Sequence, residues 1–439
     1  MKKLICAAAA LGLVAGVAAT ASALELSVSG QYFIQGNYLG EAADGEGFYP
    51  YDDNAGSMSG WNHTFLFKPT LKINDKISMK SDIRFLKDTD YGAEGAGGLG
   101  IKGERDVDIH KIWMEYMSPI GKMRFGRTPA AAWMGAYLNS PTNGDRIYLF
   151  PKMEKPWSSY VFYQKVTEND WFDGNNDSDY DIYEGSIIYT TKETKAALGY
   201  DFFNDKTNGD ADTADPFDRQ RHRVKGYVKQ TISDWWVEVE ASYDFGDWAD
   251  YDSATKDVDL DTMAAQVAVG TAFDNLKITG LFFYASGDDD LSDSDKEDAI
   301  GGGASDGTGD GFNPYYILTG DHTGMLNSDE YAADANMKRA GVMCLGVIAD
   351  MAISDKLTLH GALAYAEASE GDYKDATGVS IKRDDEYGWE VDLGASYKLL
   401  DNLTYKVEAG YFATGDFFKD YADDMRSEER RVGKECRSR

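Results

Sequence analysis

The sequence has little cysteine, little histidine and no long apolar run beyond its first residues. Of its 3 cysteines in 439 residues, only Cys344 lies away from the chain ends, so we expect neither a disulfide framework nor a cysteine metal site. After residue 23 no stretch stays apolar for about 18 residues, which excludes a transmembrane helix. The 5 histidines are scattered, and no HExxH, GxSxG or phosphate-loop motif occurs, so we expect no enzyme and no organic cofactor. A formal net charge of −31 would repel phosphate groups, so no nucleic-acid partner is expected.

The two chain ends differ in character from the rest. Residues 1–23 carry Lys2 and Lys3, then an uncharged run, then the small residues Ala21-Ser22-Ala23, which is typical of a secretory signal peptide. Residues 426–439 resemble the in-frame translation of a common sequencing adapter, although a genuine basic tail is the alternative. We therefore expect the folded domain to span residues 24–425, with its last native strand missing.

The stretch from Trp61 to Phe85 shows the dominant pattern, in which apolar and polar side chains alternate. One face carries Trp61, His63, Phe65, Phe67, Pro69, Leu71 and Ile73, and after a turn Ile77, Met79, Ser81, Ile83 and Phe85. A period of two predicts a β-hairpin. Its strands have ten or more residues, whereas strands of soluble proteins average about five to six. About 9–11 residues of tilted strand span a bilayer, so the length favours a membrane barrel.

Short turns alternate with long acidic loops along the chain, as in an up-and-down barrel. We expect the short turns on one side of the barrel and the long loops on the other. The predicted short turns are Asn74-Asp75, Ser118 to Gly121, Thr191 to Glu193, Ser233-Asp234, Asp274-Asn275, Ser354-Asp355 and Asp401-Asn402. The predicted fold is therefore all-β, a transmembrane antiparallel barrel with 17 strands present. Because such barrels hold an even number of strands, about 18 are expected in all. If the pair between Asp145 and Val166 is misread, the number is 16.

The segment Gly121-Lys-Met-Arg-Phe-Gly-Arg127 resembles a strand of trimeric Gram-negative porins, the one that precedes their inward-folded third loop. The resemblance implies a homotrimer in outer-membrane lipid and a loop near residues 128–143 that bends into the lumen. Thr128 and Pro129 suit a helix start, so residues 130–137 are predicted to form two helical turns. The segment between Arg127 and Asp145 carries no charge, which departs from the acidic loops common in the family and puts cation preference in doubt.

The strand from Arg219 to Ile232 decides which face lines the lumen. Arg221, Arg223, Lys225 and Lys229 share one face of it. One basic residue at the bilayer midplane costs about 2–4 kcal/mol, so four on the lipid side would cost on the order of 10 kcal/mol. The basic face must therefore point into the lumen.

The same reasoning over all strands predicts charged residues that line the pore. The basic ones are Lys80, Arg84, Lys122, Arg124, Arg127, Arg221, Arg223, Lys225 and Lys229, joined by Lys68 and Lys72. The acidic ones are Glu184, Glu238, Glu240, Asp244, Glu390, Asp392 and Glu408. The porin resemblance implies that opposed charges across a narrow pore order water and favour small hydrophilic solutes; the alternative is that they only solvate the wall.

The leading hypothesis is a porin for passive diffusion of small hydrophilic solutes and ions through the cell outer membrane of a Gram-negative bacterium. A solute-selective channel is the alternative, with an anion held by Arg221, Arg223 and Lys225 or a sugar held by the aromatic residues Trp113, Phe203 and Phe412. A structural or adhesive surface barrel, whose acidic loops bind cations, is a third hypothesis.

One acidic stretch matches the spacing of a calcium loop. Its candidate ligands are Asp173, Asn175, Asp177, Asp179 and Glu184, but Ser178 stands where such loops need glycine. Weak binding of Ca²⁺ or Mg²⁺ spread over the acidic external loops is the hypothesis we favour over a single site there.

Overall fold

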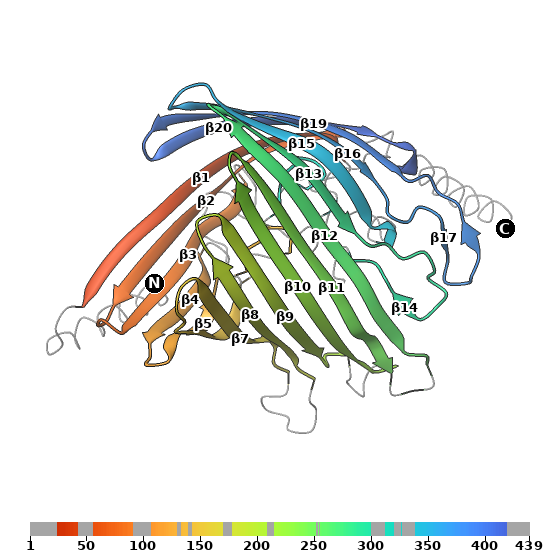
Figure 1. Cartoon of the computed structure of the whole chain (residues 1–439), viewed down its shortest axis with the longest axis horizontal. Helices are drawn as coiled ribbons and strands as arrows, with labels where there is room; N and C mark the ends of the chain where they lie inside the picture. Colours follow the sequence, from red (N-terminus) through yellow and green to blue (C-terminus); the bar gives the residue numbers. More distant parts are fainter. Residues whose placement is uncertain are drawn as a thin grey trace, which may run out of the picture.

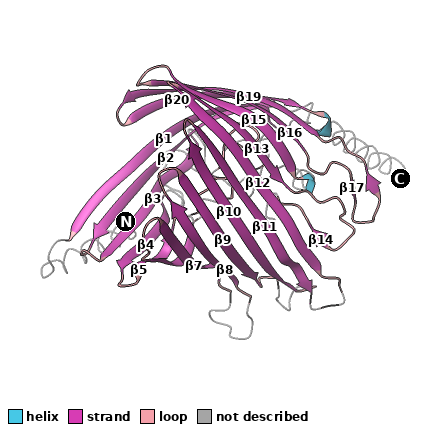
Figure 2. Cartoon of the chain, in the orientation of Figure 1, coloured by secondary structure: helices cyan, strands magenta, loops and turns pink. Residues whose placement is uncertain are grey.

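The computed structural model describes residues 24–42, 56–90, 107–129, 133–138, 143–169, 178–208, 215–251, 253, 255–299, 312–319, 326 and 339–418. The predicted signal peptide, residues 426–439, and the ligand candidates Asp173, Asn175 and Asp177 lie outside these residues. Within the described ranges, no helix is both long and apolar enough to cross a membrane. Strands account for most of the described chain (Figure 2).

The described strands form one large sheet and one small ribbon. The long strands are β1 (Glu25–Ala42), β2 (Gly56–Lys72), β3 (Ile77–Asp90), β4 (Val107–Met117), β5 (Gly121–Thr128), β6 (Gly144–Pro151), β7 (Trp157–Thr167), β8 (Tyr180–Thr190), β9 (Thr194–Asp205), β10 (Phe217–Ile232), β11 (Trp235–Tyr251), β12 (Val258–Phe273), β13 (Leu276–Ala285), β15 (Val342–Ala352), β16 (Leu357–Glu367), β19 (Glu386–Leu400) and β20 (Leu403–Thr414). Two-residue strands are β14 (Asp295–Lys296), β17 (Tyr373–Lys374) and β18 (Ser380–Ile381). The 17 long strands match the number predicted, including the pair β6 and β7.

Each long strand pairs antiparallel with the next long strand along the chain, from β1 to β20. The all-β, up-and-down prediction is therefore confirmed, and Figure 1 shows the strands following one another around a curved sheet. The sheet is not closed: among described residues, β1 pairs only with β2, and β20 only with β19. Because 17 antiparallel strands are an odd number, β1 and β20 run in the same direction.

The turns at one end have local causes. Asn74 shows this between β2 and β3, where its side-chain oxygen accepts the backbone N–H groups of Lys76 at 2.8 Å and Ile77 at 3.0 Å. Such an Asx turn replaces ladder hydrogen bonds that the reversing chain loses. A short connection of this kind forces the two strands to be neighbours and antiparallel.

The two faces of the sheet differ as alternation predicts. On β10, Val224 and Val228 are 42% and 47% exposed, whereas Arg223 and Lys225 are 5% and 3% exposed. Large apolar side chains follow the outer face of the other strands in the same way, among them Val28, Ile34, Ile147, Leu198, Val267, Val347, Leu363 and Val391. The predicted register of β10, with its basic residues on the inner face, is thus confirmed.

The core of the molecule lies on the inner face, under two connecting segments. Residues 133–138, between β5 and β6, contribute buried Trp133, Tyr137 and Leu138. This described part is bent and turned rather than helical, so the predicted helical turns are wrong there. Residues 312–319, in the long connection between β13 and β15, are also buried on the inner face through Tyr315 and Leu318. Long loops were expected on the side of the barrel opposite the short turns, whereas this connection contains an apolar stretch that packs inside.

Candidate functional site

The first inner segment, residues 133–138, is attached to β11 through one carboxylate. Glu240 is fully buried and accepts three hydrogen bonds, from Trp133 Nε1 at 2.7 Å, Tyr137 N at 3.1 Å and Leu138 N at 3.1 Å. Gly135 lies so close to this carboxylate that a Cβ atom there would overlap it. A buried carboxylate is tolerated when its oxygens are satisfied in this way. Glu240 therefore positions the segment across the interior.

The second inner segment, residues 312–319, is attached to β19 by the same chemistry. Glu390 accepts the N–H groups of Ile317 at 2.6 Å and Leu318 at 2.8 Å, and Asp392 accepts that of Tyr316 at 3.1 Å. Space for the segment comes from glycines on the inner faces of β15, β19 and β20. A Cβ atom added at Gly346 would lie 2.2 Å from the Tyr315 hydroxyl, one at Gly394 2.5 Å from the Tyr316 hydroxyl, and one at Gly410 3.3 Å from Ile317. Larger side chains at these three positions would displace the segment.

The two inner segments meet. The ring of Tyr137 lies 4.8 Å from that of Phe312, and both contact Phe283 of β13, at 5.9 and 5.3 Å between ring centroids. The Tyr137 hydroxyl also donates to the Tyr284 carbonyl at 2.8 Å. Connections that are far apart in sequence therefore join on the inner face and narrow the interior at this level.

These contacts change the role predicted for several charged residues. Glu240, Glu390 and Asp392 lie on the inner face as predicted, but each is fully buried beneath an inner segment. They cannot act as charges on a water-filled wall, because their oxygens hold backbone N–H groups.

Two of the predicted anion-binding residues are also engaged. Lys225 Nζ lies 2.9 Å from both Glu184 and Asp201, and 4.8 Å from the centre of the Trp133 ring. Arg223 pairs with Asp244 at 3.0 Å, and both side chains are buried. Removing one partner from such a pair leaves a buried charge, so these contacts stabilise the wall and do not offer an open anion site.

The basic sector on the early strands is balanced by an acid that the sequence reasoning omitted. Glu115 on β4 lies 2.7 Å from Lys80 and 2.9 Å from Arg124. Lys122 and Arg124 both lie over the ring of Phe150, at 4.5 and 4.9 Å from its centroid. The alternation of Trp113, Glu115 and Met117 on β4 could have identified Glu115, since it falls on the lumen side.

The remaining predicted residues fall in several places. Arg84 forms a hydrogen bond with His110, and the guanidinium of Arg221 lies 3.6 Å from the centre of the Phe203 ring. The other four form ion pairs, with these distances between nitrogen and oxygen: Lys229 with Glu238 at 2.6 Å, Glu408 with Lys406 at 2.5 Å, Lys68 with Asp82 at 4.0 Å and Lys72 with Asp75 at 3.0 Å. Trp113 donates to Glu115 at 3.4 Å, and Phe412 is buried beside Phe418. The prediction that Arg127 lines the pore is wrong. Arg127 lies opposite Ile112 of β4 and Asp145 of β6 in the sheet, and it shares the outer face with the exposed Ile112.

The described members of the calcium-loop candidate are separated. Asp179 bonds Lys165 and accepts the Asn169 N–H, whereas Glu184 bonds Lys225 and Tyr160. Among the residues that the structure describes, no three His, Cys, Asp or Glu side chains come close enough to share a metal ion. Glu184 has a lysine as its counter-charge, so it is poorly suited to bind a cation.

The acidic connection after β13 carries perturbed carboxyl groups. Burial, together with the carboxylates of Asp288, Asp289, Asp293 and Asp261, raises the pKa of Glu297 to about 7. In contrast, the hydrogen bond from Lys374 lowers the pKa of Asp290 to about 2. The negative charges of this connection are thus only partly balanced by lysine side chains such as Lys374.

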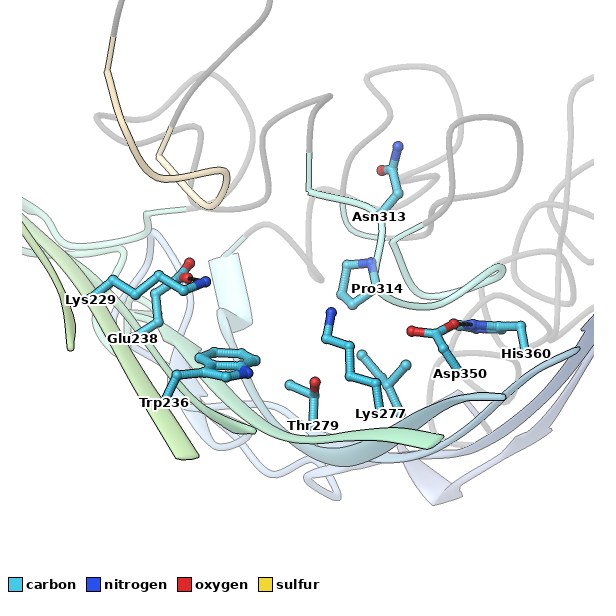
Figure 3. Close-up of a pocket in the computed structure, with 10 residues that line it drawn as sticks. Lys229, Trp236, Glu238, Lys277, Thr279, Asn313, Pro314, Asp350 and His360 are labelled. Carbon is cyan, nitrogen blue, oxygen red and sulfur yellow. Dashed lines mark hydrogen bonds and ion pairs between the residues drawn. The ribbon is translucent and has the colours of Figure 1, made fainter. Parts of the chain in front are cut away.

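A pocket of about 450 Å³ lies between the wall and the second inner segment (Figure 3). Lys229, Trp236, Glu238, Lys277, Thr279, Ile348, Asp350 and His360 come from β10, β11, β13, β15 and β16, and Asn313 and Pro314 come from the inner segment. Sequence reasoning missed Trp236, Lys277, Asp350 and His360 as site residues. Lys277 offers the one signal, because it is the only charged residue of β13.

No family model and no curated protein matches the sequence. Solved structures are similar in fold, including a BenF-like porin from Pseudomonas fluorescens Pf-5, with 13% identity over 90% of this chain and 94% of that chain and a TM-score of 0.53. OccK5 (OpdH) of Pseudomonas aeruginosa matches with 11% identity over 90% and 94% and a TM-score of 0.49. An anion-selective porin from Comamonas acidovorans matches with 10% identity over 88% and 100% and a TM-score of 0.46. At these identities the likeness concerns the fold, and the first structure is the one that supports it.

Proposed function

We propose that the protein is a channel in the outer membrane of a Gram-negative bacterium, through which small hydrophilic solutes and ions pass. Large apolar side chains follow the outer face of its strands, which suits lipid, whereas the inner face carries charged and polar side chains. The fold similarity to a porin agrees with this reading. The proposal assigns the protein no catalytic role.

The observation that carries the proposal is the attachment of two segments to the inner face by buried carboxylates. Glu240 and Glu390 each accept two successive backbone N–H groups, from Tyr137 and Leu138 and from Ile317 and Leu318. An apolar core needs no such anchoring carboxylates, since burying a charge is costly. Their presence suits an interior in which segments must be held at a set position to define the width of a pore.

Single-channel recording in planar bilayers tests the proposal. We expect discrete conductance steps from the purified protein, and larger steps when Glu240 is replaced by alanine. A shift of the step size with this variant shows that the current passes through this protein. Absence of steps from both proteins would favour a structural surface barrel with a filled interior.

We also propose that the channel works as a homotrimer, on the basis of the porin resemblance of residues 121–127. The mass of the detergent-solubilised protein, measured by light scattering, checks this. A monomeric mass at all protein concentrations would refute it.

A further inference from the structure

We propose that one proton, shared between Glu390 and Asp392, fastens the second inner segment to the wall, so that rising pH loosens the segment. The two carboxyl groups belong to β19, and the segment they hold is residues 312–319. That loosening widens a path for solutes rests on the proposed channel, whereas the loosening itself does not.

The turn that ends at Thr319 presents three successive backbone N–H groups to β19. The Thr319 hydroxyl oxygen accepts the Tyr315 N–H at 3.0 Å and donates to the Tyr315 carbonyl at 3.1 Å, which closes the turn. The N–H groups of Tyr316, Ile317 and Leu318 then meet carboxyl oxygens at 3.1, 2.6 and 2.8 Å. Backbone donors in a buried turn need acceptors, and here the wall supplies them.

The two carboxyl groups have four oxygens for these three donors. Glu390 and Asp392 are both fully buried on the inner face of β19. Three oxygens accept the N–H groups of the turn, whereas Asp392 Oδ1 is buried and accepts no N–H or hydroxyl group of a described residue. Glu390 and Asp392 are instead hydrogen-bonded to each other. Because an ionised carboxylate only accepts hydrogen bonds, this bond needs a proton on one of the two groups.

The pair has no cationic partner. In the part of the chain that the structure describes, neither Glu390 nor Asp392 forms an ion pair with a lysine or an arginine. His360 of β16 lies near Asp392, but its Nδ1 lies 2.9 Å from Asp350 of β15, and it carries charge only when protonated (Figure 3). Burial and mutual repulsion therefore both oppose a second negative charge on the pair.

The other titratable groups near the pair do not supply a positive charge either. Glu408 of β20 lies near Asp392 and pairs with Lys406 of the same strand at 2.5 Å. The remaining groups are the Cys344 thiol of β15 and the hydroxyls of Tyr315 and Tyr316 in the segment. The shared proton is therefore what limits the pair to a single negative charge.

Glu240, which holds the first inner segment, differs in this respect. It is a single carboxylate whose oxygens accept three N–H groups, and Glu238 on the same face is paired with Lys229 at 2.6 Å. An ionised Glu240 thus satisfies its segment without a proton. We expect only the second segment to be held by groups that become doubly charged as pH rises.

The direction of the pH effect follows from proton binding in the two states. The attached pair keeps one proton, whereas in a released segment water reaches both groups, and ordinary carboxyl groups are ionised above about pH 4. The attached state therefore binds one proton more in neutral solution, and attachment weakens as pH rises. One proton changes the ratio of released to attached segment by up to about tenfold per pH unit.

Hydrogen exchange at the amides of Tyr316, Ile317 and Leu318 in the full chain tests the proposal, with Asp392→Asn as the reference. In this variant the amide oxygen can accept the Tyr316 N–H while the NH₂ group donates to Glu390, which reproduces the protonated pair at every pH. The ratio of the wild-type rate to the Asp392→Asn rate at equal pH cancels the intrinsic pH dependence of exchange. We expect this ratio to rise at least about tenfold between about pH 6 and about pH 8.

Two further variants keep the test decisive. Asp355→Asn makes the same chemical change in an exposed turn and should exchange as wild type does. Glu390→Gln removes the need for a proton but turns an NH₂ group toward a segment N–H, so exchange should be fast already at about pH 6 and show no further pH response. A wild-type rate in constant ratio to that of Asp392→Asn would overturn the shared proton. A pH response that His360→Gln abolishes and Asp392→Asn retains would assign it to the histidine and likewise overturn the proposal.

Hydrogen exchange needs no current, so this inference and the proposed channel can fail separately. In planar bilayers the step size should rise with pH for wild type and stay constant for Asp392→Asn. The expected exchange ratio without any conductance would refute the channel and leave the shared proton standing. Conductance together with a constant exchange ratio would do the reverse.

Discussion

Replacing Glu240 by alanine should release the first inner segment without unfolding the sheet. The substitution removes three hydrogen bonds, from Trp133, Tyr137 and Leu138. A hydrogen bond to a charged group contributes about 1.5–3 kcal/mol net, so the three together hold the segment with roughly 5–9 kcal/mol. Non-additivity and access of water reduce that sum. A loss of only about 3 kcal/mol still raises the ratio of released to attached segment more than about a hundredfold.

Graded variants make the prediction sharper. In Glu240→Gln, the amide oxygen can take the place of Oε1 and keep the bonds from Trp133 and Leu138, but its NH₂ group then faces the N–H of Tyr137. We expect an effect between that of wild type and that of Glu240→Ala. Gly135→Ala should act in the same direction, because its Cβ would overlap the carboxylate of Glu240.

Single-channel conductance is the assay, with thermal unfolding of the sheet as its companion. Glu240→Ala should give larger and noisier steps and a nearly unchanged unfolding temperature, since the strand ladder of β11 is intact. The exposed turn residue Glu193 provides the control, and Glu193→Ala should behave as wild type. Steps of wild-type size from both Glu240→Ala and Gly135→Ala would refute the anchoring role.

Three further predictions concern other parts of the molecule. Gly394→Leu should displace the second inner segment, because the Tyr316 hydroxyl lies 2.5 Å from the position of an added Cβ; protease cleavage near residue 316 should increase. Folding raises the pKa of Glu297 from 4.5 to about 7, so the folded protein binds this proton more tightly than the unfolded chain does. The free energy of unfolding therefore falls as pH rises from about 4.5 through 7. After correction for the intrinsic pH dependence of exchange, amide hydrogens of residues 293–299 should therefore exchange faster at pH 8 than at pH 5. The variant Glu297→Gln should remove this difference. Amide hydrogens on the outer edges of β1 and β20 should exchange faster than those of β10, which pairs on both sides; equal protection would contradict the open sheet.

Most of the strand architecture followed from local pattern. Alternation along Arg219 to Ile232 predicts both the strand and its lumen face, because a period of two places every second side chain on the same side. Asn74 shows the same for a turn, since its side chain bonds the backbone two and three residues on. Such features depend on neighbours in sequence, so the sequence by itself determined them.

A bulge shows where local pattern fails. Tyr387 and Trp389 alternate as if both pointed outward, and Trp389 is exposed, yet Tyr387 is buried and donates to the Gly341 carbonyl at 2.7 Å. The register shifts beside Gly388, whose φ of 132° is a conformation that favours glycine. The sequence marks the glycine but not which way the residue before it turns.

The candidate site depended on partners that are remote in the chain. Glu238 and Glu240 are two residues apart on one face of β11, and alternation treats them alike. One lines the pocket with Lys229, and the other is buried beneath Tyr137, 103 residues away in sequence. Strand formation and facing are set by the chain's own period, whereas burial of a carboxylate is set by which distant segment packs over it, and only the tertiary structure decided that.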